Sequence, residues 1–306
     1  MPDNEVYPWQ SNNEVLQDLL VLLNLEALET NLFRGESRDL GGKSVFGGQV
    51  LGQAMVAASR TVEAGRPPHS LHGYFLRPGD MEAPIVYEVD RVREGRSFTT
   101  RRVQGIQHGK VIFSAIASYH GDEPGFQHGP PMPDVPPPED LVSQHELRRQ
   151  WAASRDDIPA KLKQAFCRPL AIDFKPVKAR NPLRPDTREP RHPVWIKAAD
   201  VLPQDEILHR CVLAYASDFG LLPTGLLPHG KTFIDQDMIV ASLDHAIWFH
   251  SSFRADEWLL YCMESPWAGS ARALSRGQIF NRRGDLVASV AQEGLIRHVG
   301  HAEESR

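Results

Sequence analysis

The chain has 306 residues, of which 41% are hydrophobic, and its formal net charge at pH 7 is −5. This length and apolar content suit two units that each bury a core, and the negative charge argues against a nucleic-acid-binding protein with a broad basic face. The three cysteines, Cys167, Cys211 and Cys262, are odd in number and far apart, so they predict no disulfide framework and a reducing, cytoplasmic location.

The first predicted element is an amphipathic helix over 15–28, with Asn12 or Asn13 as its N-cap. This stretch is too short and too often interrupted by polar residues to span a membrane. A strand is expected near 31–35 and a second helix over 48–62. Hydrophobic alternation then predicts four strands, over 70–76, 85–92, 98–106 and 111–120.

A proline-rich segment over 123–142 follows, and such a density of proline is incompatible with a regular element. A charged helix is expected over 144–166. Beyond it the order of the first half recurs. An opening strand is expected near 193–198, then a helix over 205–220 and strands over 240–249, 258–264, 271–280 and 286–298.

The two halves also share a hairpin, in which Gly109 and Gly284 occupy corresponding tight turns. A long helix followed by long antiparallel strands predicts an α+β fold in which each half wraps a sheet around one helix. We expect an N-terminal unit over 14–121, a linker and helix over 122–167 and a C-terminal unit over 168–300. The units are expected to pair as a homodimer would. The alternative is an accidental repeat, because the halves share order more than identity.

Several familiar motifs are absent from the sequence. Gly41-Gly42-Lys43-Ser44 resembles the end of a phosphate-binding loop, but Ser37 stands where the required glycine should be. There is no Gly-x-Ser-x-Gly elbow, and the 13 histidines show no metal-ligand spacing. No metal or cofactor is therefore expected.

Polar residues in apolar surroundings give the clearest functional signal. In the strand over 286–298, Gln292 shares a face with Leu286, Ala288, Val290 and Ile296. A carboxamide in such a row either is a satisfied core group or faces a ligand. The segment Phe46-Gly47-Gly48-Gln49 at a helix start is similarly open to two interpretations. Its glycines either let a ligand approach free N–H groups or form a tight loop.

Ordered strings along nearly the whole chain resemble the acyl-CoA thioesterase II (TesB-like) family, which has a double hotdog fold. They include Val45-Phe-Gly-Gly-Gln-Val, His72-Gly-Tyr-Phe-Leu-Arg-Pro-Gly-Asp80, Ala214-Tyr-Ala-Ser-Asp218, Leu243-Asp-His-Ala-Ile-Trp-Phe-His250 and Val290-Ala-Gln-Glu-Gly294. The resemblance implies a tandem double hotdog and the hydrolysis of acyl-CoA to a free fatty acid and coenzyme A. In the family an Asp, a Thr or Ser, and a Gln hold the hydrolytic water, and these positions correspond here to Asp218, Ser242 and Gln292.

The chemistry of these residues agrees with that expectation. Asp218, with a pKa raised by burial, can act as the base, while Ser242 and Gln292 fix the water. Gly47 and Gly48 are candidate oxyanion donors, and Gln49 and His72 are candidate substrate-binding residues. Asp244 and His245 form a rival dyad, but neighbours on a strand point to opposite faces, so both are interpreted as supporting residues.

Two alternatives to the hydrolase remain at this point. One is a hydratase or dehydratase of the same fold, acting on enoyl-CoA, and the other is a non-catalytic acyl-CoA-binding protein. Four arginines, Arg101, Arg102, Arg272 and Arg276, either meet coenzyme A phosphates or are solvated strand-face charges. The expected partner is acyl-CoA, without nucleic acid or membrane, and the chain is a candidate homo-oligomer, a dimer or a tetramer.

Overall fold

The structure is a computed structural model that describes residues 9, 11–155 and 160–299. The expected boundary at 300 lies outside this part. The helices and strands are, in chain order, α1 (Glu14–Leu23), β1 (Glu26–Glu29), β2 (Leu32–Gly35), α2 (Gly47–Ser59), β3 (Pro68–Phe75), β4 (Ile85–Glu94), β5 (Phe98–Gln107), β6 (Lys110–His120), η1 (Pro138–Asp140), α3 (Gln144–Ala153), α4 (Ala160–Phe166), β7 (Ile172–Pro176), β8 (Arg191–Ala198), α5 (Glu206–Ser217), α6 (Leu221–Thr224), η2 (Leu227–His229), β9 (Met238–Ser242), β10 (Asp244–Phe249), β11 (Leu259–Gly269), β12 (Arg272–Phe280) and β13 (Leu286–His298).

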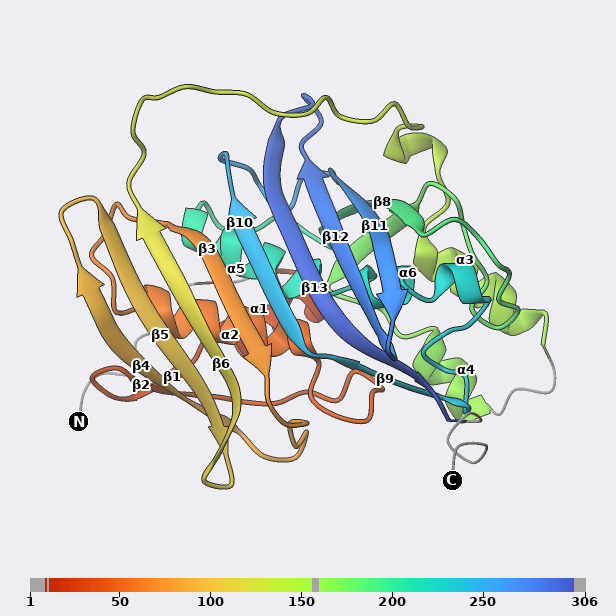
Figure 1. Cartoon of the computed structure of the whole chain (residues 1–306), viewed down its shortest axis with the longest axis horizontal. Coiled ribbons are helices and arrows are strands. Elements are labelled where there is room, and N and C mark those ends of the chain that lie inside the picture. Colours follow the sequence, from red (N-terminus) through yellow and green to blue (C-terminus); the bar gives the residue numbers. More distant parts are fainter. Residues whose placement is uncertain (1–8, 10, 156–159, 300–306) are drawn as a thin grey trace.

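The α+β fold with a repeated order of elements is confirmed. Each half places a long helix, α2 or α5, behind antiparallel strands (Figure 1). The strands form one continuous sheet in the order β1-β2-β4-β5-β6-β3-β10-β13-β12-β11-β8-β7, with β9 paired to β13. The halves join where β3 pairs with β10, in the register His245 opposite Gly73 and Ile247 opposite Leu71. This edge-to-edge pairing removes two free sheet edges.

The helices α2 and α5, one from each half of the chain, pack directly against each other. Small residues allow this approach: a Cβ on Gly52 would lie 3.4 Å from the carbonyl oxygen of Cys211, and one on Gly48 would lie 2.3 Å from that of Tyr215. Apart from Gly47, every residue of α2 is buried. The packing therefore sets the N-terminal end of α2 against the C-terminal end of α5.

Three element predictions need correction. The first helix ends at Leu23, because its cap Asn24 is extended and the next residues form β1. The strand expected over 240–249 is two strands that separate at Leu243, whose carbonyl instead accepts from Phe75 N–H. The helix expected over 144–166 is found as α3 and α4, with 156–159 outside the described residues.

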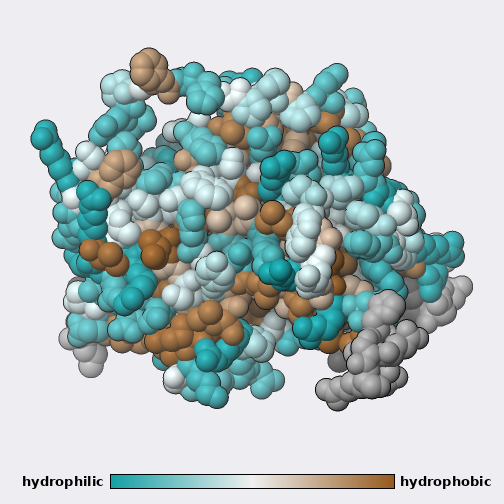
Figure 2. Space-filling model, viewed as in Figure 1, coloured by the Kyte–Doolittle hydropathy of each residue, from teal (hydrophilic) through white to brown (hydrophobic). Residues whose placement is uncertain are grey.

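The proline-rich segment has a packing role. Figure 1 shows it running from β6 across the top of the sheet toward the far side of the second half. Its residues Met132 and Val135 pack on a small outer core of Trp195, Leu260 and Phe280, and Trp195 Nε1 donates to the carbonyl of Pro136 at 2.9 Å. The rest of the outer face is mixed in polarity, with scattered apolar patches (Figure 2).

One stretch, Glu206–His229, is long and apolar enough to cross a membrane by length and composition alone, and 67% of its apolar 18-residue window is buried inside the fold. It comprises α5, α6 and η2. Ten of the twelve residues of α5 are buried against α2 and the sheet, so its apolar character is accounted for by the core.

Candidate active site

The side chains of Asp218, Ser242 and Gln292 meet at one point, where Asp218 and Gln292 are buried and Ser242 is half-buried. Asp218 is the C-cap of α5, Ser242 ends β9, and Gln292 faces inward from the middle of β13. Gln292 Nε2 lies 2.7 Å from Asp218 Oδ1 and 3.2 Å from Ser242 Oγ. The pairing of β9 with β13, with Ser242 opposite Gly294, sets the distance between the hydroxyl and the carboxamide.

The environment of the Asp218 carboxyl group suits it to act as a general base. Desolvation by burial raises its pKa to about 6, while hydrogen bonds from Gln292 and from the backbone of Gly48 act in the opposite direction. Its side chain is 5% exposed. Phe46 packs against Phe219 at 4.4 Å and Tyr215 at 5.4 Å between ring centroids, which supplies apolar surroundings near this end of α5.

The glycines at the start of α2 lie directly against this carboxylate. Gly48 N–H donates to Asp218 Oδ2 at 2.9 Å, and a Cβ on Gly47 would lie 2.8 Å from the same oxygen. The sequence predicted free N–H donors here, but it did not show that one of them bonds the base itself. The positive end of the α2 dipole therefore also stabilises the ionised form of Asp218.

Two other candidate residues lie elsewhere. Gln49 is buried, but its carboxamide accepts from Arg38 N–H at 3.1 Å and donates to the Glu36 carbonyl at 3.1 Å, so it anchors the loop before α2. His72 is exposed on the outer face of β3, against Trp248 at 4.7 Å between ring centroids. Its inward neighbours are Leu71 and Gly73, and strand alternation therefore turns its ring away from Asp218.

His245 is the site residue whose contacts the sequence did not reveal. Asp244 and His245 do face opposite sides: Asp244 Oδ1 accepts from Glu293 N–H at 2.7 Å, whereas His245 is 1% exposed. The His245 ring lies 3.3 Å from Gln292 Nε2 and 3.8 Å from Asp218 Oδ1, measured at Nδ1. In the sequence, the contact could have been anticipated only from the alternation pattern, which places both His245 and Gln292 at inward-facing positions of their strands.

The site is built from hydrogen-bonding groups. Within the described ranges, no set of three or more His, Cys, Asp or Glu side chains is arranged to hold a metal ion. Gln292 Oε1 is buried, and no protein donor in the described part of the chain reaches it. An acceptor in this condition is suited to receive a hydrogen bond from water or substrate.

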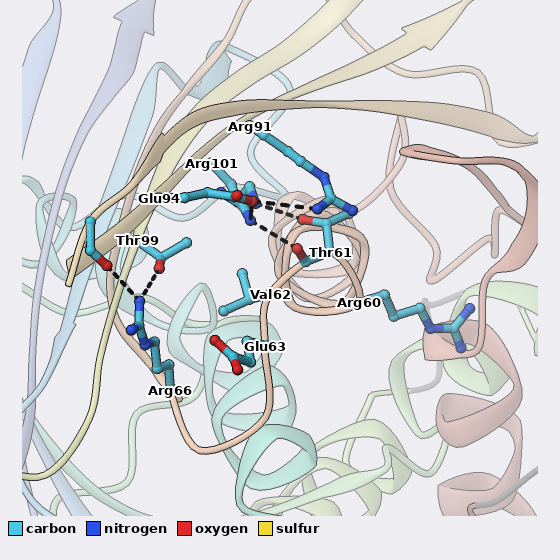
Figure 3. Close-up of a pocket in the computed structure, with 10 residues that line it drawn as sticks. Arg60, Thr61, Val62, Glu63, Arg66, Arg91, Glu94, Thr99 and Arg101 are labelled. Atoms are coloured by element: carbon cyan, nitrogen blue, oxygen red, sulfur yellow. Dashed lines mark hydrogen bonds and ion pairs between the residues drawn. The ribbon is translucent and has the colours of Figure 1, made fainter. Parts of the chain in front are cut away.

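The corresponding end of α2 has different chemistry. Its C-cap is Arg60, where α5 has Asp218. A cavity of about 480 Å³ next to it is lined by Arg66, Glu94 and Arg101 among others (Figure 3). Arg101 is 1% exposed and donates to Thr61 and Glu94. Figure 3 shows Arg60 turned away from this group, and its guanidinium donates to Asn24 and Leu25.

Two family models match the chain, one in each half. The model described as acyl-CoA thioesterase N-terminal domain matches residues 36–120, and the model described as acyl-CoA thioesterase matches residues 159–295. Acyl-coenzyme A thioesterase 8 from Homo sapiens is 41% identical over 298 residues, which cover 95% of this chain and 93% of that protein.

Solved structures give the same result. Acyl-CoA thioesterase II TesB2 from Mycobacterium marinum has a TM-score of 0.73 at 42% identity, covering 92% of this chain and 97% of that one. A hot-dog-fold protein from Alicyclobacillus acidocaldarius has a TM-score of 0.72 at 19% identity, with coverage of 92% and 98%, and confirms the fold. The chain therefore belongs to the acyl-CoA thioesterase II family.

Proposed function

We propose that Asp218, Ser242 and Gln292 carry out the hydrolysis of acyl-CoA thioesters that membership of this family assigns to the chain. One observation supports these roles above all. Three polar side chains from one helix end and two strands meet around the buried carboxyl group of Asp218, whose pKa is raised to about 6. A carboxylate with such a pKa is ionised at neutral pH and can still accept a proton.

After their bonds within the protein are counted, Asp218, Ser242 and Gln292 keep enough hydrogen-bond donors and acceptors to hold one water molecule. Each oxygen of Asp218 accepts one bond from the protein and keeps a second lone pair. Gln292 Oε1 can accept the other hydrogen of the water, and the Ser242 hydroxyl can donate to the water oxygen. A thioester carbonyl placed beside this water would be attacked without a covalent enzyme intermediate.

In the proposed reaction, Asp218 carries out both proton transfers. Asp218 removes a proton as the water oxygen bonds to the carbonyl carbon. Collapse of the tetrahedral intermediate breaks the carbon–sulfur bond, and the sulfur of coenzyme A takes the proton back from Asp218. We assign the developing oxyanion to the N-terminal end of α2, where Gly47 N–H is the first donor.

Replacement of Asp218 by Asn tests this mechanism. It keeps the shape but removes the base, so thiol release from acyl-CoA should fall by ~10²–10⁴. The measurement is release of free thiol, detected with a disulfide reagent. The matched control is Asp244→Asn, because Asp244 faces the opposite side of β10 from His245, and Asn keeps an oxygen that can accept from Glu293 N–H. Near-normal turnover by folded Asp218→Asn would refute the assignment.

The same assay separates the two alternatives. A hydratase would convert enoyl-CoA without releasing thiol, so saturated and enoyl substrates are compared in parallel, with loss of the enoyl absorbance as a second readout. A non-catalytic acyl-CoA-binding protein would release thiol from neither. We expect thiol from both substrate types, with the loss in Asp218→Asn common to both.

We also propose a reducing, cytoplasmic location and a homo-oligomeric state, without stable association with a membrane. Support for the first comes from Cys167, Cys211 and Cys262, which are all free thiols. Fractionation of cells producing the native protein tests location and membrane association, and light scattering of the purified chain tests oligomeric state.

A further inference from the structure

His245 lies directly behind the proposed water site, and its ring is enclosed by hydrogen-bonding partners. Its side chain is fully buried. Nδ1 lies 3.3 Å from Gln292 Nε2, and Nε2 lies 2.9 Å from Ser217 Oγ. Both ring nitrogens therefore have a neutral hydrogen-bond partner, while the Asp218 carboxylate lies beyond hydrogen-bond range, with Oδ1 3.8 Å from Nδ1. A charged imidazolium would be poorly solvated here, and burial lowers the pKa of His245 to about 3.

The contact with Ser217 determines which ring nitrogen carries the proton. Ser217 Oγ is 2.9 Å from the carbonyl oxygen of Ala214, which can only accept, so the single hydroxyl hydrogen is used there. Toward His245 the same oxygen must accept, and Nε2 must carry the hydrogen. The carbonyl of Ser217 is itself held by Tyr261 OH at 2.9 Å. Nδ1 of His245 is therefore a lone-pair acceptor that faces Gln292.

The orientation of the Gln292 carboxamide follows from two acceptors. Ionised Asp218 needs a donor at 2.7 Å, which places Nε2 and not Oε1 beside it. Nε2 carries two hydrogens, and two acceptors compete for the second, Ser242 Oγ at 3.2 Å and His245 Nδ1 at 3.3 Å. A reversed carboxamide would set Oε1 against a carboxylate oxygen and an imine lone pair together. Bonding to His245 also leaves the Ser242 hydroxyl available to water.

We propose that His245 is a positioning residue for hydrolysis, whose Nδ1 fixes the Gln292 carboxamide so that its Oε1 is presented to the attacking water. This inference rests on the role of Gln292 proposed above. His245 exchanges no proton in this scheme. Its contribution belongs to the chemical step, because it acts on the carboxamide and touches neither the acyl chain nor coenzyme A.

The tautomer can be measured on the unaltered enzyme. Nitrogen-15 and proton correlation spectra of histidine-labelled protein distinguish a protonated Nε2 from a protonated Nδ1. We expect His245 to be neutral, with its proton on Nε2, between about pH 5 and 8. A proton on Nδ1 would overturn the proposal, because Nδ1 could then no longer accept from Gln292.

Substitutions test the catalytic consequence. His245→Leu removes the acceptor with an apolar group of similar size, and kcat should fall roughly 10-fold or more with KM within about twofold. His245→Asn places an amide oxygen near the position of Nδ1 and should restore kcat to within about fivefold of wild type. A rise in KM with unchanged kcat, or no rescue by Asn in folded protein, would contradict the positioning role.

A double-mutant cycle separates positioning from a general packing effect. If His245 acts through Gln292, His245→Leu should change kcat less than about twofold in a Gln292→Ala background. A packing role predicts that the two losses multiply. If Gln292→Ala alone retains full activity, the mechanism proposed above fails. If Gln292→Ala is impaired while His245→Leu is not, only the present inference fails.

Discussion

At the residue scale, two opposing effects set the acidity of Asp218. Burial disfavours the charge, while donors from Gln292 and Gly48 favour it, and burial dominates. A carboxylate with the ordinary value of 3.8 would be a weaker base at neutral pH. The buried position of Asp218 at the end of α5 thus has a chemical effect beyond packing.

The pH dependence of kcat/KM should show this pKa. The base must be ionised, and below a pKa of about 6 Asp218 is protonated. The rate constant kcat/KM should therefore rise with pH up to about 6 and level off above it. Steady-state thiol release at constant ionic strength measures the profile. Asp244→Asn should keep the same inflection, and a profile that is flat across this range would exclude Asp218 as the essential base.

Ser242 and Gln292 are expected to act as one unit. Ser242→Ala and Gln292→Ala should each lower kcat, and the double variant should lose less than the product of the two losses, because both hold one water. Ser242→Thr keeps the hydroxyl and should be tolerated. Kinetics of all four variants test this expectation. Strictly multiplicative losses, or an acyl group trapped on Ser242 and detected by mass spectrometry, would contradict a shared water.

At the scale of elements, the site depends on how closely α2 approaches α5. Gly48 permits this approach, since a Cβ at this position would collide with the backbone of Tyr215 and the ring of Phe46. The same approach allows Gly48 N–H to reach Asp218 at 2.9 Å. Helix packing and the pKa of the base are therefore linked through one residue.

Gly48→Ala should damage stability and activity together. An added Cβ would lie 2.3 Å from the Tyr215 carbonyl oxygen, and relieving such overpacking costs about 1–3 kcal/mol or more. Thermal unfolding and kcat/KM are measured side by side. Gly125→Ala is the matched control, because its Cβ would have nothing within 4 Å. Wild-type stability in Gly48→Ala would mean that the two helices can separate freely.

At the scale of the whole molecule, the tandem halves are alike in fold and unlike in chemistry. The sequence alignment of the two hairpins places Ala117 opposite Gln292, and the helix ends place Arg60 opposite Asp218. Ala117 is fully buried in β6 and carries no hydrogen-bonding side chain. A homodimer of this fold would have two equivalent sites, whereas this chain has the complete set of proposed catalytic residues at one.

Ligand titration tests this asymmetry. A non-hydrolysable acyl-CoA analogue in which a thioether replaces the thioester should bind with one equivalent per chain by calorimetry. The expected reason is that Arg60 and Ala117 stand in the first half where the second half has Asp218 and Gln292. Two equivalents of equal affinity per chain would show that the first half retains a working site.

The sequence alone determined the repeat, the α+β class and most element bounds, because hydrophobic alternation and glycine turns are local properties. Gly109 and Gly284 have the positive φ that their hairpins require, at 69° and 90°. The sequence did not reveal the break at Leu243, because β9 and β10 pair with the distant strands β13 and β3. It also did not reveal the short strand β7, which is defined by its pairing with β8. The end of α1 likewise depends on the pairing of β1 with β2.

For the site, the sequence and the family resemblance identified Asp218, Ser242 and Gln292, because polar groups in apolar strands and matching strings are visible in one dimension. Only the tertiary structure showed that Gly48 N–H bonds the base, that Gln49 holds a loop, and that His72 faces outward. It alone placed His245 against Gln292. Hydrogen-bond partners are chosen by distance and direction in space, and these are fixed only when helices and strands from both halves pack together.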